Sequence, residues 1–377
     1  MSEKRILIAS LLKPINDTRL YEKLGVTISK LPGSYVHICA YEAPIPENAP
    51  HNISFHPIFS FKRLSLGRAK AQYDYYQLLL QVKPELIIVS THELLLVSYL
   101  YKQKYKCDLV YDVQENYSLN LRAQHNYSQG LKHLMAFGVR GFEKLTANGI
   151  DHFLLAERSY AEELPFVQGR YTFIENKYKA PSNQIIPDTP VAIPTEGPLR
   201  LLYSGTIAEE YGVWEAIALV ERLHALNTAV QLTIIGYCAN AQTWDRLQAA
   251  CQKLPFVELI GGDRLVPHRL ILEKMGESHI GLLPYRPNAS TFRCIPTKHY
   301  EYMAHALPTL IQQNPLWQGI VEGSGAGLSI DFRTVDVPVL YKQLLSMRFY
   351  AQGIPDDIFW QSEEEKLLAL VQDLLTK

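Results

Sequence analysis

The sequence predicts an α/β protein with two domains, each built on a parallel sheet covered by helices on both faces. Short, continuous apolar runs alternate with segments of helical period along most of the chain, as expected for strands buried on both faces. The chain has 377 residues, whereas single hydrophobic cores stop growing at roughly 250–300 residues. A proline-rich stretch near the middle, 178–198, shows neither the period of a helix nor that of a strand and is typical of a linker.

The first half alternates regularly between apolar strands and helices. The predicted strands are 5–12, 36–40, 53–55, 86–90, 108–113, 151–156 and 171–174. The predicted helices are 18–31, capped by Asp17 or Thr18, followed by 66–82, 94–104, 128–147 and 159–163. Ligands of such sheets bind at the carboxyl ends of the strands, so the candidate binding loops are 13–18, 90–93 and 113–120.

The second half repeats this architecture. Its predicted strands are 199–203, 230–235, 257–260, 279–283, 309–311 and 328–330. Its predicted helices are 213–226, 241–253, 267–275, 297–305 and 315–322, with a closing helix at 362–375. We therefore expect a first domain at 1–177, a linker at 178–198 and a second domain at 199–345. The remaining segment, 346–377, is expected to be helical and to pack back on the first domain.

Composition excludes several classes of protein. A formal net charge of −1 gives no general attraction for nucleic acid. Five cysteines without C-x-x-C spacing favour a reducing compartment. No apolar run reaches the roughly 18 residues of a membrane span, and the N-terminus favours a buried strand over a signal peptide. No Asp-x-Asp pair offers carboxylates for a metal-bound diphosphate. We expect a cytoplasmic protein that needs neither a metal nor another cofactor.

One segment of the first half, 59–70, interleaves apolar and basic residues. Phe59, Phe61, Leu64 and Leu66 alternate with Lys62, Arg63, Arg68 and Lys70. This pattern could contact an anionic membrane, which would place the protein at the inner face of the membrane. A solvated helix start explains the same residues.

The segment 284–310 has the strongest functional pattern. Pro296 and Thr297 predict a helix start, which places Lys298 in the first turn, where the helix dipole disfavours a cation. An anion held beside the lysine would offset that cost. Glu301 lies on the same helical face and could accept ribose hydroxyls, while Arg293 could add a guanidinium. The alternative is an ordinary Lys–Glu surface pair.

Two glycines follow strands of the second half. Gly205 and Thr206 come directly after the first of these strands, and a glycine there lets a ligand approach the backbone. Gly236 and Tyr237 follow the next strand, where a tyrosine could stack on a base or ribose. Ordinary strand-to-helix turns remain the alternative. Tyr285 completes the candidate binding residues of this half.

Polar residues also gather at predicted strand ends of the first half. Glu115 could act as a proton acceptor, and an Asx-type turn would explain the same loop. Helix capping by Asp17 and a structural role for His92 are further alternatives. The candidates on this side are Asp17, Arg19, His92, Gln114 and Asn116.

Five motifs together resemble the group 1 retaining glycosyltransferases, also called glycogen-synthase-like. They are NDTRLYEKL, LVYDVQENY, LLYSGTIAEEYGVWEAI, IPTKHYEYMAHALPTL and SEEEKLLALVQDLL, in that order along nearly the whole chain. The resemblance implies the GT-B architecture, in which two Rossmann-like domains face a central cleft. It also implies a nucleotide-sugar donor (a UDP- or GDP-sugar is expected), a saccharide or lipid-linked acceptor, and no metal. Glu301 would then hold the donor ribose, and Gly205 would lie against the diphosphate or sugar.

The sequence departs from the pattern of that group in three places. Arg293 stands where a second glutamate is usual, Gln114 stands where a histidine is common, and the loop 207–212 has no cation. We hypothesise that Arg293 and Lys298 supply the missing positive charge. The candidate catalytic residues are Glu115, Lys298 and Arg293. The alternatives are a sugar-nucleotide epimerase and a nucleotide-sugar-binding protein with weakened catalysis.

Overall fold

The computed structural model describes residues 3–62, 65–123, 129–181, 184–288 and 291–376. The chain divides into two compact units. The first unit contains Met1–Lys179 and Trp360–Lys377, and the second contains Ala180–Phe359. The chain thus leaves the first unit after residue 179 and returns to it at residue 360, whereas the sequence placed the start of the returning segment at 346.

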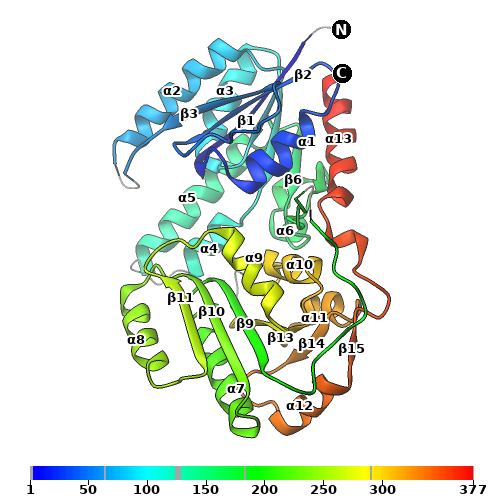
Figure 1. The fold of residues 1–377 in the computed structure, drawn as a ribbon. Helices are drawn as coiled ribbons and strands as arrows, with labels where there is room; N and C mark the ends of the chain where they lie inside the picture. Colours follow the sequence, from blue (N-terminus) through cyan, green and yellow to red (C-terminus); the bar gives the residue numbers. More distant parts are fainter. Residues whose placement is uncertain (1–2, 63–64, 124–128, 182–183, 289–290, 377) are drawn as a thin grey trace. The chain divides into compact units, whose positions relative to one another are not determined.

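The first unit is built on a seven-stranded parallel sheet (Figure 1). The strand order is β3-β2-β1-β4-β5-β6-β7. The strands are β1 (Lys4–Pro14), β2 (Ser34–Tyr41), β3 (Ile53–Phe59), β4 (Leu86–Val89), β5 (Asp108–Val113), β6 (His152–Leu155) and β7 (Tyr171–Phe173). Central strand residues such as Ile6–Ala9 are fully buried because helices cover both faces.

The helical segments of the first unit include a returning C-terminal helix. They are η1 (Thr18–Gly25), α1 (Val26–Ile28), α2 (Gly67–Val82), η2 (His92–Leu94), α3 (Leu95–Lys104), α4 (Tyr117–Ala123), α5 (Gln129–Ala147), α6 (Tyr160–Glu163), η3 (Pro165–Val167) and α13 (Gln361–Thr376). In Figure 1, α13 (red) lies beside α1 (blue). Trp360, Leu367 and Val371 join the core around β1 and β2, so α13 belongs to this unit.

The second unit is built on a six-stranded parallel sheet with the order β11-β10-β9-β12-β13-β14. The strands are β9 (Leu199–Thr206), β10 (Val230–Tyr237), β11 (Val257–Gly262), β12 (Ile280–Leu283), β13 (Thr309–Gln312) and β14 (Gly327–Ile330). The helical segments are α7 (Val213–Leu226), α8 (Ala241–Cys251), α9 (His268–Glu277), α10 (Thr297–Ala304), α11 (Pro315–Val321), α12 (Val337–Ser346) and η4 (Asp356–Ile358).

The structure differs from the predicted elements in four places. The predicted helix 18–31 is a wide π-helical turn, η1, followed by one short α-helical turn. The predicted linker contains β8 (Val191–Ala192), which pairs with β15 (Arg348–Phe349) far away in the sequence. Two helices were not predicted, α4 and α12. The strands β9 and β10 extend through their glycines, because Gly205 pairs with Gly236 in the parallel ladder.

Among the described residues of the apolar–basic segment 59–70, only Phe59 is buried, and Leu66 is 92% exposed. Phe59 is fully buried at the end of β3, so it is a core residue. Arg68 forms an ion pair with Glu93, and Lys70 forms one with Asp74, which neutralises both cations. Residues 63–64 lie outside the described residues, as does position 128, where the helix that is now α5 was predicted to begin.

Candidate functional site

The candidate binding residues of the second unit gather at the carboxyl end of its sheet. The order of the strands reverses between β9 and β12, since β10 and β11 lie on one side of this pair and β13 and β14 on the other. Such a switch point leaves a crevice outside the strand ends, where parallel α/β sheets bind ligands. Gly205 is the last residue but one of β9, and the segment that leads to α10 follows β12.

Glu301 is the centre of this site. It projects from α10 and is buried. Its Oε2 accepts a hydrogen bond from Lys298 Nζ, one helical turn earlier. Its Oε1 lies 2.5 Å from Nε2 of His268, the first residue of α9. Both carboxylate oxygens are therefore engaged by donors, whose place the hydroxyl groups of a ligand could take.

Glu301 is held in its charged form. Burial alone would raise its pKa, but the hydrogen bond from His268 and the charge of Lys298 outweigh burial and lower the pKa to about 2. Glu301 is consequently an acceptor of hydrogen bonds across the physiological pH range, as recognition of sugar hydroxyls requires.

Two glycines let the strand ends and α10 approach one another. A Cβ on Gly205, whose φ is +113°, would lie 3.3 Å from Lys298 Cε, so the lysine stem lies across this residue. A Cβ on Gly236 would lie 1.6 Å from the Gly205 carbonyl oxygen. The close approach of the two strand ends thus requires a glycine at position 236. Tyr302 adds a further tie, because its Oη lies 2.9 Å from Ser204 Oγ.

Helix α11 fixes the segment that carries Arg293. Asn314 Nδ2 donates to the carbonyl of Phe292 at 2.7 Å, and Trp317 Nε1 donates to the carbonyl of Cys294 at 2.7 Å. Arg293 lies between these two anchored carbonyls, and its side chain is exposed. Pro296 occupies the cap position of α10 without a side-chain cap, so the Thr297 hydroxyl does not cap the helix.

The other candidates of the second unit lie at the same edge. Thr206 and Tyr237 are cross-strand neighbours at the ends of β9 and β10, and both are exposed. The Tyr285 ring lies 5.3 Å from that of Tyr211 and 6.0 Å from that of Trp317. The rings of Tyr211 and Trp317 therefore form much of the surroundings of the Tyr285 side chain.

A second charged cluster lies in this unit and was not predicted. Glu215, in the first turn of α7, is buried, and its Oε1 accepts hydrogen bonds from Arg286 (2.9 Å) and Arg333 (2.8 Å). Burial would raise the pKa of Glu215, but these two guanidinium groups lower it. The arginines follow β12 and β14, so only the folded sheet brings them to α7. The same holds for His268, which lies 33 residues before Glu301.

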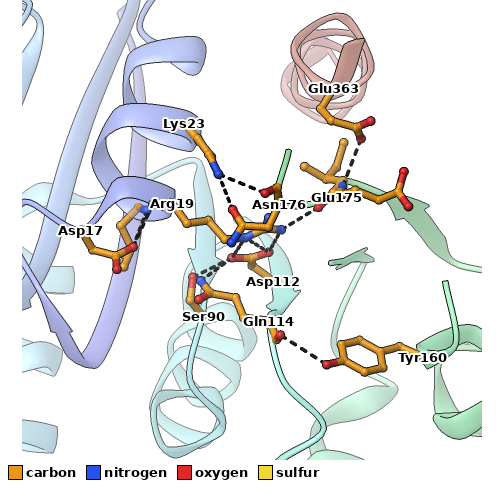
Figure 2. A network of polar contacts seen from close by, with 12 residues as sticks. Asp17, Arg19, Lys23, Ser90, Asp112, Gln114, Tyr160, Glu175, Asn176 and Glu363 are labelled. Carbon is orange, nitrogen blue, oxygen red and sulfur yellow. Dashed lines mark hydrogen bonds and ion pairs between the residues drawn. The ribbon is translucent and has the colours of Figure 1, made fainter. Parts of the chain in front are cut away.

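The first unit has a buried polar network at the carboxyl ends of its strands (Figure 2). Arg19 and Asp112 form an ion pair at its centre, with Arg19 Nη2 2.6 Å from Asp112 Oδ1. Arg19 also donates to the carbonyl of Ile174 at 2.9 Å. Ser90 and Gln114 both donate to Asp112 Oδ2. The guanidinium of Arg19 thus links β5 to the segment that follows β7.

The other polar candidates of the first unit make contacts within the protein. Asp17 caps η1, accepting from Arg19 N and Leu20 N. His92 is half-buried beside the Tyr117 ring, and burial lowers its pKa. Asn116 donates to Glu163 and accepts from Arg140. Glu115 is half-buried and accepts from Asn120 at 3.1 Å.

A buried lysine of the first unit was also not predicted as a candidate residue. Lys23 donates to both oxygens of Asn176 and lies 5.8 Å from the centre of the Trp360 ring. Burial, together with the charge of Arg19, lowers its pKa to about 7. Asn176 and Trp360 flank the points where the chain leaves and re-enters this unit.

Comparison with solved structures decides the fold. Sucrose-phosphate synthase from Thermosynechococcus elongatus matches with a TM-score of 0.68 and 13% identity over 99% of this chain and 100% of that one. The catalytic domain of starch synthase IV from Arabidopsis thaliana, bound to ADP and acarbose, matches with a TM-score of 0.61 and 10% identity over the whole of both chains. The chain has the GT-B fold.

The GT-B fold also occurs in another kind of enzyme. A putative UDP-N-acetylglucosamine 2-epimerase from Listeria monocytogenes matches with a TM-score of 0.61 and 11% identity over 100% of this chain and 97% of that one. No family model matches the sequence, and no curated protein matches it. The GT-B assignment thus rests on the structure.

Proposed function

We propose that the protein is a retaining, metal-independent glycosyltransferase, which moves a hexosyl group from a nucleotide-sugar donor to a saccharide or lipid-linked acceptor. The observation that carries this proposal is the group formed by Glu301, Lys298 and His268 beside Gly205. It combines an ionised acceptor for ribose hydroxyls with donors for a diphosphate. Similar structures have been solved with UDP or ADP bound.

The charges of this site suit departure of a nucleoside diphosphate. Negative charge grows on the diphosphate as the glycosidic bond breaks, and preorganised cations stabilise that charge most. Lys298 would turn from Glu301 toward the diphosphate, and the exposed Arg293 would add a guanidinium. On the acceptor side, Glu115, Gln114 and Asn116 would contact the incoming saccharide. Among the described residues, no group of three or more His, Cys, Asp and Glu side chains is arranged to hold a metal ion.

Nucleotide titration tests the donor site. UDP, GDP and ADP are titrated calorimetrically into the wild type and into the Glu301→Gln and Lys298→Met variants. We expect binding of one nucleotide, weakened about tenfold or more in each variant because a charge-assisted hydrogen bond contributes roughly 1.5–3 kcal/mol. Lys342→Met, an exposed lysine on α12, is the matched control and should bind as the wild type does. Unchanged affinity in Glu301→Gln would remove the basis of the proposal.

An epimerase is the second candidate, favoured by the structural match to the Listeria protein. A time course by NMR separates the two activities. With a UDP-sugar and no acceptor, an epimerase interconverts two donor sugars, whereas a transferase only hydrolyses the donor slowly. In the presence of an acceptor, a retaining transferase gives a product with the anomeric configuration of the donor.

A further inference from the structure

Helix α5 exposes apolar side chains to solvent and buries polar ones. The exposed fractions are 68% for Leu134, 73% for Phe137, 49% for Phe142 and 69% for Leu145. These positions recur at intervals of three to five residues and form one stripe. Amphipathic helices of globular proteins normally bury such a stripe, so this helix has the inverse orientation.

Buried hydrogen bonds lock α5 in this orientation. Glu143 is 1% exposed and accepts from Tyr111 Oη at 3.2 Å and from Arg140 Nη1 at 3.0 Å. Arg140 also donates to Asn116 Oδ1 at 2.8 Å, and Thr146 is fully buried. Rotating the helix to bury its leucines and phenylalanines would break this network and leave a buried carboxylate without donors. The apolar stripe is therefore held outward by the interior of the unit.

The charges around the stripe identify its partner. Glu143 is the only acidic residue of α4 and α5, and it is buried. The exposed charged residues of the two helices are basic, Arg122 on α4 and Lys144 on α5. Exposed cations on the helices that carry an apolar stripe complement an anionic lipid surface. Two copies of this chain joined through the stripe would bring their cations together, which disfavours a dimer.

The helix has the dimensions of an interfacial element. It contains 19 residues, a length of about 28 Å at 1.5 Å per residue. No helix in the described part of the chain is both long enough and apolar enough to cross a bilayer. We propose that α5 docks the first unit on an anionic membrane, with its leucines and phenylalanines entering the boundary between headgroups and acyl chains. This surface is separate from the segment 59–70, which the sequence had suggested for that purpose.

Vesicle flotation tests this proposal with the full chain. The protein is mixed, at low and at high salt, with vesicles made of phosphatidylcholine alone or of phosphatidylcholine containing 30% phosphatidylglycerol. We expect flotation with the anionic vesicles, weakened by salt because the headgroup attraction is screened. The double variant Phe137→Ser/Leu145→Ser should bind about tenfold less, and Lys144→Glu should lose much of the preference for anionic lipid. Both serine changes are at exposed positions, so folding is preserved.

Leu226→Ser, at a 50% exposed leucine of α7 in the second unit, is the matched control and should float like the wild type. A wild type that stays unbound, or a double variant that floats as well as the wild type, overturns the proposal. So does a light-scattering mass of a dimer that the double variant reduces to a monomer, since the stripe would then join two copies. Nucleotide titration of the double variant should be unchanged, so failure here is distinguishable from failure of the donor site.

Discussion

Residues that are close in sequence could be paired by sequence reasoning, and distant ones could not. Lys298 and Glu301 are three residues apart, so helical geometry alone predicts their contact, which the structure shows. Neither His268 nor the pair Arg286 and Arg333 carries a local signal, because their partners come from other elements. Arg19 was predicted as a candidate from its loop, but its ion pair with Asp112 depends on the order of strands in the sheet.

The buried amine of Lys23 makes the stability of the first unit depend on pH. Its pKa is about 7 in the folded protein, against roughly 10.4 in an unfolded chain. Between these values the unfolded chain binds the extra proton, so stability rises as pH rises through this window. Below about pH 7 the amine is protonated in both the folded and the unfolded protein, so the full free-energy cost of burying its charge opposes folding.

We therefore expect Lys23→Met to flatten the dependence of stability on pH. The contribution of one proton is at most about 1.4 kcal/mol per pH unit. Native-state hydrogen exchange in β1 and β5, followed from pH 6 to pH 9 and corrected for intrinsic exchange rates, would report the free energy of unfolding. Lys106→Met, an exposed lysine before β5, should keep the slope of the wild type. An unchanged slope in Lys23→Met would show that Lys23 stays charged when buried.

Element types were predictable from hydrophobic period, whereas element ends depended on contacts. Most predicted strands and helices are present. A continuous apolar run indicates a strand buried on both faces, and apolar residues at helical spacing indicate the buried face of a helix. The strands β9 and β10 run further than predicted, since the ladder continues through Gly205 and Gly236. The short strands β8 and β15 were missed because two-residue pairing between distant segments leaves no period in the sequence.

The ladder between β9 and β10 gives a prediction of its own. Gly236→Ala places a methyl group 1.6 Å from the Gly205 carbonyl oxygen, so the strand ends must separate. We expect a loss of about 2 kcal/mol or more in the stability of the second unit, together with weaker nucleotide binding. Gly276→Ala, in α9, is the control: its added methyl group meets nothing within 4 Å, and it should stabilise by up to about 1 kcal/mol. The unfolding temperatures of the two variants, each compared with that of the wild type, test this prediction.

At the scale of the whole molecule, the two-domain organisation followed from chain length and from the proline-rich interruption. The point of return to the first unit did not. Trp360 marks this point by its contacts, since its backbone N–H donates to the carbonyl of Tyr178 and its Nε1 donates to Thr27 Oγ1. Both partners are far away in sequence, so no local pattern could have distinguished 360 from 346.

Trp360→Ala should destabilise the first unit selectively. The indole is 1% exposed, and removing such a side chain from a core costs about 3–5 kcal/mol. Hydrogen exchange should accelerate in β1, β2 and α13 and stay unchanged in β9 and β10. Trp317→Ala, in the second unit, should give the reverse pattern. Equal acceleration in both units after either change would show that the two cores unfold together.

The position of α13 also has a consequence for biosynthesis. The first unit needs Trp360–Lys377 to complete its core, whereas all of the second unit, Ala180–Phe359, is synthesised before them. Domains commonly fold in N-terminal to C-terminal order as the chain is made. Here the second unit can finish folding first, while the core surface around β1 and β2 stays exposed until α13 has been synthesised. The core of the first unit is thus completed only after the whole of the second unit has been synthesised.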